Sequence, residues 1–383
     1  MVCGYISMAN PFEDRLAWSG LIFKIREAIE NAGVEVKWIP FNDRRRNRFL
    51  DFILRKCSNH QLITGHTPWS ARNKARSIDR SLFKDCDFLF VPNGSEIIPY
   101  IDTRLPIITN GDATYHVMLD YYYHDVSWLQ AKLGEAGERK AVRRADVVCK
   151  ASHWAVDSVI RDYGGHPDHT YVLEFGANID ESDISPIAPY TGEGCLNILF
   201  SGVDWERKGG DLAVQTVECL IASGVNAKLM ICGISQLPAA CQSKDFIIHY
   251  GFLNKNNPVD YQTYREAFAS AHIFLLPTKA ECAGVVFSEA SAFGLPIYTH
   301  DTGGISDYVI NDVNGYRLPL GSRAEDFARK IQETLSPETQ QRLHHGGMGL
   351  YKTKLNWNSW SQQFRAILEK EILKHKTKKP SHV

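Results

Sequence analysis

The residues of this chain best suited to chemistry gather in two short segments of its second half. In residues 276–295, Glu281 and Glu289 are separated by seven residues, and Gly284 lies between them where an apolar helix would begin. The free N–H groups and dipole of a helix start hold phosphate or a sugar hydroxyl. Glu281 would then face the bound group, and Glu289 could grip a ribose diol. The alternative is a first-turn acid favoured by the dipole and an unrelated helix glutamate.

A pair of cations precedes a second expected helix start. A buried strand runs into residues 201–202, followed by a loop with Arg207 and Lys208 and then by Gly209 and Gly210. Adjacent cations at a helix N-terminus suit a diphosphate. The spacing is neither Gly-x-Gly-x-x-Gly nor a Walker loop, which argues against nicotinamide cofactors and ATP cleavage. The alternative is a solvated cation pair in an exposed loop.

Both segments lie in a chain whose apolar runs alternate with segments of helical period. Runs that are apolar throughout favour strands covered on both faces, and helices between them form βαβ units. The sequence therefore predicts an α/β fold. The expected strands are residues 2–8, 34–41, 88–92, 106–110, 147–151, 171–175, 196–202, 228–232, 246–250, 273–277 and 296–300.

A break in this pattern divides the chain into domains. Its 383 residues are too many for one ordinary core, and residues 182–194 carry prolines, glycines and acids without periodicity. We expect two Rossmann-like, doubly wound parallel-sheet domains over residues 1–185 and 186–355. A C-terminal helix and basic tail follow over residues 356–383, and the helix could cross back to the first domain. Since ligands bind at the carboxyl ends of such strands, we expect the site in a cleft where the domains face each other.

Composition excludes several classes of protein. The chain is 44% hydrophobic and 11% aromatic, unlike a disordered protein, and its formal net charge of −1 argues against a nucleic-acid coat. No apolar run approaches the roughly 18 residues of a membrane-spanning helix, and the first residues show no secretory signal. Nine cysteines without a Cys-x-x-Cys pair suit a reducing compartment better than disulfides or zinc. We therefore expect a cytoplasmic protein.

Together, the two segments resemble glycosyltransferase family 4, the retaining group 1 glycosyltransferases of GT-B architecture. An Arg-Lys-Gly loop follows the first strand of the C-terminal domain, and Glu-x7-Glu comes later in the same domain. Further matches are Trp-Ser-Gly at residues 18–20, Gly-Ala-Asn at 176–178 and Asp-Thr-Gly-Gly at 301–304. The resemblance covers nearly the whole chain and is most specific over residues 196–320.

The resemblance implies transfer of a sugar from a nucleotide-sugar donor to a hydroxyl of a glycan or lipid-linked acceptor. A UDP-sugar is favoured and a GDP-sugar is possible, in the synthesis of surface polysaccharide, lipopolysaccharide or another glycoconjugate. Arg207 and Lys208 would hold the diphosphate and stabilise its growing charge, which removes the need for a metal. The other donor contacts implied are Glu281 with the transferred sugar, Glu289 with the ribose, the backbone of Gly284, Val285 and Val286 with phosphate or sugar, Gly20 with the phosphates, and Gly233, Phe252 and Leu253 with the base.

On the acceptor side, Ala-Thr-Tyr-His at residues 113–116 resembles the histidine-bearing loop of the family. His116 would hydrogen-bond the sugar or accept a proton from an acceptor hydroxyl, and the alternative is a half-buried structural histidine. Asp112, at a strand end, is a second candidate for this task or a helix cap. The basic run Arg44–Arg48 would touch the inner face of an anionic membrane, or it is a solvated loop.

Two departures from the family pattern stand at the donor side. Val203 follows Gly202 where members often carry an arginine, and Glu-Cys-Ala-Gly replaces the usual Glu-Gly-Phe-Gly at residues 281–284. The identity of the donor sugar therefore does not carry over from the family. Two other functions stay open: a GT-B-shaped subunit that binds a nucleotide sugar or a partner without turnover, and a nucleotide-sugar epimerase.

Overall fold

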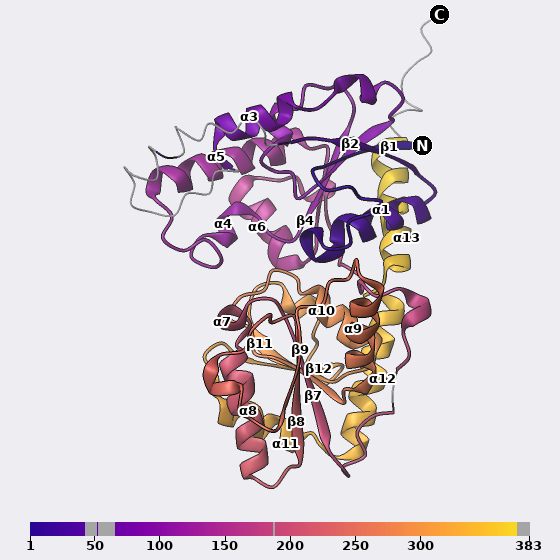
Figure 1. Cartoon of the computed structure of the whole chain (residues 1–383). Helices are drawn as coiled ribbons and strands as arrows, with labels where there is room; N and C mark the ends of the chain where they lie inside the picture. Colours follow the sequence, from indigo (N-terminus) through magenta and orange to yellow (C-terminus); the bar gives the residue numbers. More distant parts are fainter. Residues whose placement is uncertain (43–51, 53–65, 187, 374–383) are drawn as a thin grey trace, which may run out of the picture. The chain divides into compact units, whose positions relative to one another are not determined.

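The computed structural model describes residues 1–42, 52, 66–186 and 188–373, so the basic run Arg44–Arg48 lies outside the described residues. These residues form two compact units (Figure 1). Unit 1 comprises Met1–Glu174 and the chain from Trp360 onward, and unit 2 comprises Phe175–Ser359. Each unit is built around one six-stranded sheet.

Unit 1 has the strand order β2-β1-β3-β4-β5-β6, with all neighbours parallel. Every residue of the three strands β3, β4 and β5 is buried, and β3 is accordingly apolar throughout. The strands are β1 (Val2–Ser7), β2 (Glu35–Pro40), β3 (Phe88–Pro92), β4 (Ile107–Gly111), β5 (Val147–Lys150) and β6 (Thr170–Val172). The helices are α1 (Leu21–Asn31), α3 (Pro68–Arg76), α4 (Tyr115–Met118), α5 (Trp128–Arg144), α6 (His153–Tyr163) and most of α13 (Trp357–Leu368), which continues as a π-helix over Glu369–Leu373.

Unit 2 has the strand order β12-β11-β10-β7-β8-β9, again with all neighbours parallel. Its strands are β7 (Leu196–Ser201), β8 (Ala227–Cys232), β9 (Ile247–Gly251), β10 (Ile273–Leu276), β11 (Ile297–Asp301) and β12 (Gly315–Pro319). Its helices are α7 (Trp205–Lys208), α8 (Gly210–Ala222), α9 (Pro258–Ser270), α10 (Val285–Ala292), α11 (Ala324–Glu333) and α12 (Pro337–Thr353).

Each sheet has one point where the direction of strand addition reverses. In unit 2 the chain lays down β7, β8 and β9 to one side and then returns to add β10, β11 and β12 on the other. In unit 1 the reversal falls between β1 and β3. Such reversal points leave a crevice at the carboxyl ends of the two strands, where ligands of doubly wound sheets bind.

The expected fold class is confirmed, and each expected strand is present with its ends shifted by no more than three residues. The sequence predicted five strands in the second half, but the sheet of unit 2 has six, and β12 is the strand that was not predicted. This strand lies at the sheet edge and is only partly buried, so it lacks a continuous apolar run. It begins at Gly315, where a Cβ would lie 2.0 Å from the carbonyl oxygen of Ile297.

The contact boundary between the units lies at Glu174, earlier than the proline- and glycine-rich residues 182–194. The reason is that the chain from Phe175 is hydrogen-bonded to unit 2 before the linker begins. The Phe175 backbone N–H donates to the Tyr308 hydroxyl at 3.0 Å, and the Ser288 hydroxyl donates to the Phe175 carbonyl at 2.8 Å. Composition marks the stretch rich in proline and glycine, whereas these contacts mark where unit 2 starts.

The end of α13 completes the core of unit 1. Trp360 is fully buried and stacks on Phe364 at a centroid distance of 4.9 Å. Phe364 in turn meets Phe90 of β3 edge-on at 5.6 Å and Phe88 at 6.5 Å. The unit is therefore assembled from both ends of the described chain.

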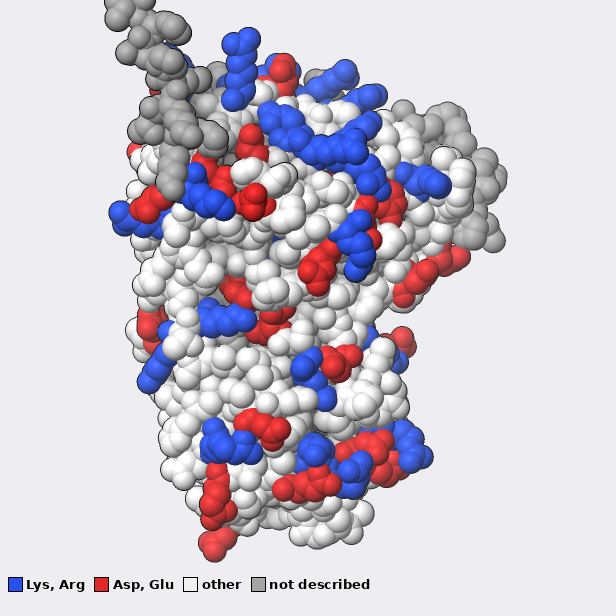
Figure 2. Space-filling view, turned by 180° about the vertical axis from the view of Figure 1, so that it is seen from behind, with Lys and Arg blue, Asp and Glu red and all other residues white. Residues whose placement is uncertain are grey.

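Charged side chains of both signs are interspersed over most of the face in Figure 2, with a run of Lys and Arg near its top. This distribution fits the formal net charge of −1. Among the described residues, no helix is long and apolar enough to cross a bilayer.

Candidate active site

The expected donor residues of unit 2 follow four neighbouring strands, β9, β8, β7 and β10. Because these strands are parallel, the loops after them emerge at one edge of the sheet. Arg207 and Lys208 follow β7, whereas Glu281 and Gly284 follow β10. The cations and Glu281 therefore lie at the reversal point of the sheet, where such folds bind ligands.

A buried ion pair joins the two segments singled out by the sequence. The Lys208 ammonium contacts the Glu281 carboxylate, and the two side chains are only 10% and 11% exposed. The Lys208 stem lies against Gly202, where a Cβ would come 2.9 Å from the Lys208 Cγ atom. Because Gly202 has no side chain, the Lys208 stem can pass close to the backbone after β7 and bring its ammonium to Glu281 in the loop after β10.

Arg207 is fixed by the same neighbouring loop. Its Nη1 donates to the Ala280 carbonyl at 3.0 Å and lies 3.9 Å from a Glu281 oxygen, and its own carbonyl accepts from the backbone N–H of Lys279 at 2.8 Å. The expected open loop is in fact the one-turn helix α7, capped by the Asp204 side chain. This turn places Arg207 and Lys208 directly before the start of α8 at Gly210.

Gly209 joins α7 to α8 and is held in the left-handed region at φ +76°, where a Cβ would lie 2.2 Å from the Pro277 carbonyl oxygen. We expect Gly209→Ala to lower the free energy of unfolding by about 2 kcal/mol, from backbone strain and the forced separation of two loops. Gly224→Ala is the matched control: its φ is +91°, but no atom of the described residues lies within 4 Å of its Cβ position. Urea denaturation should show that Gly224→Ala lowers the free energy of unfolding by about 1 kcal/mol. Equal losses in both variants would contradict the close approach at Pro277.

Glu289 is buried on α10 and already has two protein partners. The Lys255 ammonium lies 2.8 Å from its Oε1, and the Tyr264 hydroxyl donates to its Oε2 at 2.7 Å. Lys255 also lies over the Tyr264 ring at 4.2 Å. Each carboxylate oxygen can accept more than one hydrogen bond, so this arrangement fixes the carboxylate and leaves acceptor capacity for a diol.

The hydroxyl of Tyr264 stabilises a buried charge, so Tyr264→Phe is expected to lower the free energy of unfolding by about 1.5–2 kcal/mol. Tyr316→Phe is the control, since its hydroxyl donates to the exposed carboxylate of Asp312 and its loss should cost less than about 0.5 kcal/mol. Urea titration of both variants measures the difference. A Tyr264→Phe loss no greater than that of the control would show that Glu289 finds another donor.

The backbone positions expected to contact the donor stand at the same edge. Gly284 caps α10 with φ +80°, and α10 begins at Val285 and Val286. Gly233 follows β8 with φ +93°, and its Cβ would lie 2.5 Å from the Gly202 carbonyl oxygen. Phe252 and Leu253 follow β9, and Phe252 is 48% exposed. The structure thus places the expected donor residues of unit 2 after four adjacent strands.

In unit 1, the expected Gly20 ends an unusual turn. Trp18, Ser19 and Gly20 have φ values of 50°, 57° and 87°, so three consecutive residues lie in the left-handed region before α1 begins. The Trp18 indole donates to the Asp112 carboxylate at 3.2 Å. Such a conformation persists only where its surroundings enforce it, and it is concentrated at binding sites.

His116 lies on α4 with a side chain that is 50% exposed, and its Nδ1 is 2.8 Å from a Glu135 oxygen. Its ring is thus half-exposed and held by a carboxylate of the same unit. Asp112 follows β4 and accepts the hydrogen bond of the Trp18 indole.

Several residues that the sequence analysis did not single out shape these sites. Lys255 and Tyr264 hold Glu289, and the Thr278 hydroxyl donates to the Ala280 carbonyl at 3.0 Å. An isolated lysine between asparagines gives no sequence signal, since its partner is distant in the chain.

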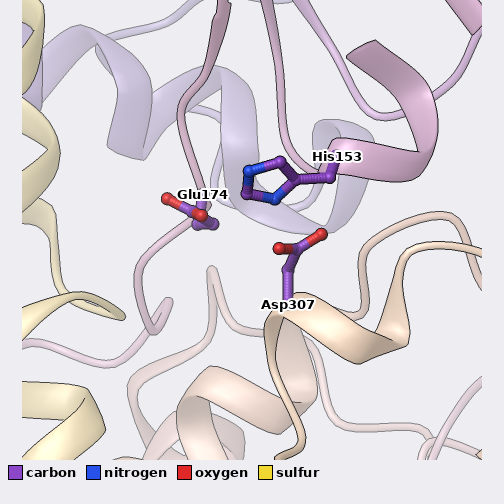
Figure 3. A group of neighbouring side chains, drawn as sticks. All are labelled: His153, Glu174 and Asp307. Carbon is purple, nitrogen blue, oxygen red and sulfur yellow. The ribbon is translucent and has the colours of Figure 1, made fainter. Parts of the chain in front are cut away.

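A second feature outside the sequence expectations is a histidine–carboxylate pair in unit 1. His153 starts α6 and Glu174 follows β6, with their nearest ligand atoms within 4.8 Å (Figure 3).

Comparison with known proteins agrees with this geometry. Residues 192–348 match the family described as glycosyl transferases group 1. A D-inositol 3-phosphate glycosyltransferase of Xylanimonas cellulosilytica is 26% identical over 195 residues, which are 47% of this chain and 46% of that protein. A GDP-mannose-dependent monoacylated alpha-(1-6)-phosphatidylinositol monomannoside mannosyltransferase of Corynebacterium glutamicum is 21% identical over 275 residues, 67% of this chain and 70% of that protein. The match thus spans about half the length of the first of these relatives.

The fold has solved counterparts as well. HepE of Anabaena, solved in complex with UDP and glucose, superimposes with a TM-score of 0.62 at 13% identity, covering 96% of this chain and 99% of that one. Two doubly wound six-stranded sheets are thus the GT-B fold. Residues 192–348, which form most of unit 2, are similar to the group 1 glycosyl transferases.

Proposed function

We propose that the protein is a retaining glycosyltransferase that moves a sugar from a nucleotide-sugar donor to a hydroxyl of a glycan or lipid-linked acceptor. The observation that carries this proposal is the convergence of Arg207, Lys208, Glu281 and Glu289 after strands β7 and β10. Two cations and two carboxylates at a reversal point suit a diphosphate, a sugar and a ribose together. The family of residues 192–348 supports the same activity.

The proposed chemistry takes place on one face of the donor sugar. The bond between the anomeric carbon and the diphosphate oxygen breaks, and the acceptor oxygen forms a bond to the same carbon. The acceptor proton passes to the departing diphosphate oxygen. Arg207 and Lys208 stabilise the charge that grows on this oxygen, so the reaction proceeds without a metal. Glu281 positions the sugar and need not form a covalent intermediate.

The side chains of Lys208 and Glu281 are buried enough for their charges to interact strongly with a bound diphosphate. Lys208 and Glu281 neutralise each other in this structure, so a donor diphosphate would share the Lys208 ammonium with that carboxylate. Glu289 would accept hydrogen bonds from the ribose, while the backbone N–H groups of Val285 and Val286 would contact phosphate or sugar. We assign the base to Gly233, Phe252 and Leu253.

Unit 1 is proposed to serve the acceptor. His116 would hydrogen-bond the sugar or receive a proton from the acceptor hydroxyl, and Asp112 is a second candidate. Gly20 would allow the phosphates to approach the backbone closely. A lipid-linked acceptor would bring the protein to a membrane surface, where we propose that the Arg44–Arg48 run makes a peripheral contact.

The first experiment should identify the nucleotide of the donor. A UDP-sugar is our first expectation, in line with the UDP and glucose bound by HepE, and a GDP-sugar is the second, in line with the name of the Corynebacterium relative. A thermal-shift screen with UDP, GDP, ADP and their common sugar conjugates should give a shift for one nucleotide.

Product analysis then separates the candidate functions. We expect release of nucleoside diphosphate and a product in which the transferred sugar keeps the anomeric configuration that it had in the donor. EDTA should not affect the reaction. A melting shift without any product would favour a binding subunit, and a changed donor sugar without acceptor would identify an epimerase. No shift and no turnover with any nucleotide sugar would reject the proposal.

A further inference from the structure

The His116 ring belongs to a hydrogen-bonded cluster that joins three helices of unit 1, α4, α5 and α6 (Figure 1). The Nδ1 atom of His116 is 2.8 Å from an Oε1 of Glu135 on α5. The backbone N–H of His116 donates to the Tyr163 hydroxyl on α6 at 2.8 Å. The Glu135 carboxylate also lies close enough to the Tyr163 hydroxyl to raise the pKa of that tyrosine. One carboxylate is therefore near both the imidazole and the tyrosine.

A glycine in α5 allows this cluster to form. At Gly134, a Cβ would lie 2.1 Å from the Tyr115 ring, so α5 can approach α4 only because this side chain is absent. The next residues along the two helices are Glu135 and His116. The packing of Tyr115 on Gly134 thus sets the separation of the carboxylate and the imidazole.

Two further contacts hold the residues directly before α4, the helix that carries His116. The Lys150 ammonium donates to the Ala113 carbonyl at 2.6 Å, and the hydroxyls of Thr114 and Ser158 are 2.6 Å apart. These contacts are buried or partly buried, so they fix the backbone on which His116 stands. The orientation of the ring then depends mainly on Glu135.

The direction of the hydrogen bonds follows from the chemistry of the partners. Tyr163 is fully buried, and burial together with the nearby Glu138 and Glu135 carboxylates raises its pKa, so the hydroxyl keeps its proton. Its oxygen accepts the hydrogen of the His116 backbone N–H. An ionised carboxylate can only accept, so the His116 nitrogen that faces it must carry the hydrogen.

We propose that Glu135 is a positioning residue that holds His116 in the tautomer protonated on Nδ1, so that Nε2 presents its lone pair to a hydroxyl of the sugar or acceptor. This inference rests on the proposed function for its catalytic meaning. The tautomer assignment itself stands on unit 1 alone.

The experiment that tests it is ¹⁵N NMR of the full chain labelled at histidine, in mildly alkaline buffer, with His116→Asn used to assign the ring signals. The wild-type ring is expected to carry its proton on Nδ1. In Glu135→Ala the signals should move toward the Nε2-protonated form that free histidine prefers. Glu135→Gln, which keeps the shape, guards against loss of folding and should give an intermediate spectrum. Asp157→Ala, on the exposed face of α6, is the matched control and should leave the signals unchanged.

Kinetics provide the second readout. With donor and acceptor, Glu135→Ala should lower kcat by about tenfold or more while the donor KM changes less than about twofold. A wild-type ring protonated on Nε2, or a spectrum unaffected by Glu135→Ala, would overturn the inference. An expected spectrum with an unchanged kcat would overturn the positioning role. A protein that turns over no nucleotide sugar would refute the proposed function, while the spectrum would still decide the tautomer.

Discussion

Replacing Lys208 by methionine is expected to lower the rate of sugar transfer by about 10³-fold. The reason is that its ammonium is buried at the reversal point of the second sheet, where a charge interacts strongly with a departing diphosphate because little water screens it. The measurement is kcat/KM with the donor found in the thermal-shift screen. Lys228→Met is the matched control, since Lys228 is exposed on β8 and should leave the rate within about twofold.

Stability has to be separated from catalysis in this experiment. Lys208→Met removes the ammonium that pairs with the buried Glu281 carboxylate, and breaking a buried pair typically costs about 3 kcal/mol. The double variant Lys208→Met with Glu281→Gln removes both charges and should recover much of that loss. Its transfer rate should nevertheless stay low. Recovery of the rate along with stability would contradict a role for Lys208 in holding the diphosphate.

Trp360→Ala is expected to lower the free energy of unfolding of unit 1 by about 4 kcal/mol. Its indole is fully buried against Phe364, which itself packs on Phe88 and Phe90, so truncation leaves a large cavity at the aromatic core. Trp128→Ala is the matched control, because that indole is 73% exposed. It should cost less than about 1 kcal/mol.

Hydrogen exchange can report this loss for each unit. Amides of β3 in unit 1 should exchange much faster in Trp360→Ala, whereas amides of β7 in unit 2 should keep their wild-type rates. Equal acceleration in both strands would mean that the units unfold as one. No acceleration in β3 would mean that the end of α13 adds little to unit 1.

The strands of the two sheets could be predicted because most are buried on both faces. A run such as residues 88–92 has no solvent side, so its sequence is apolar throughout and its ends are sharp. The edge strand β12 could not be found in this way, because Tyr316 and Arg317 lie half-buried and interrupt the pattern. Its place is set by pairing with β11, a contact between strands that no local window contains.

In the site, too, features set by neighbouring residues could be predicted, whereas contacts between residues distant in the sequence could not. The start of α10 at Gly284 and of α8 at Gly210 could be read from glycines before apolar helices. The partners that fix the charges could not, because they are distant in sequence: Lys255 stands far from Glu289, and Glu135 from His116. Only the fold brings these pairs together.

The return of the chain to unit 1 at Trp360 has a consequence for biosynthesis. All of unit 2, from Phe175 to Ser359, is synthesised before Trp360 and Phe364. Until those residues emerge from the ribosome, Phe88 and Phe90 lack the aromatic rings that cover them in the finished protein. Nascent unit 1 therefore carries an open apolar surface of the kind that chaperones bind. The unit whose strands are made first is the one that finishes folding last.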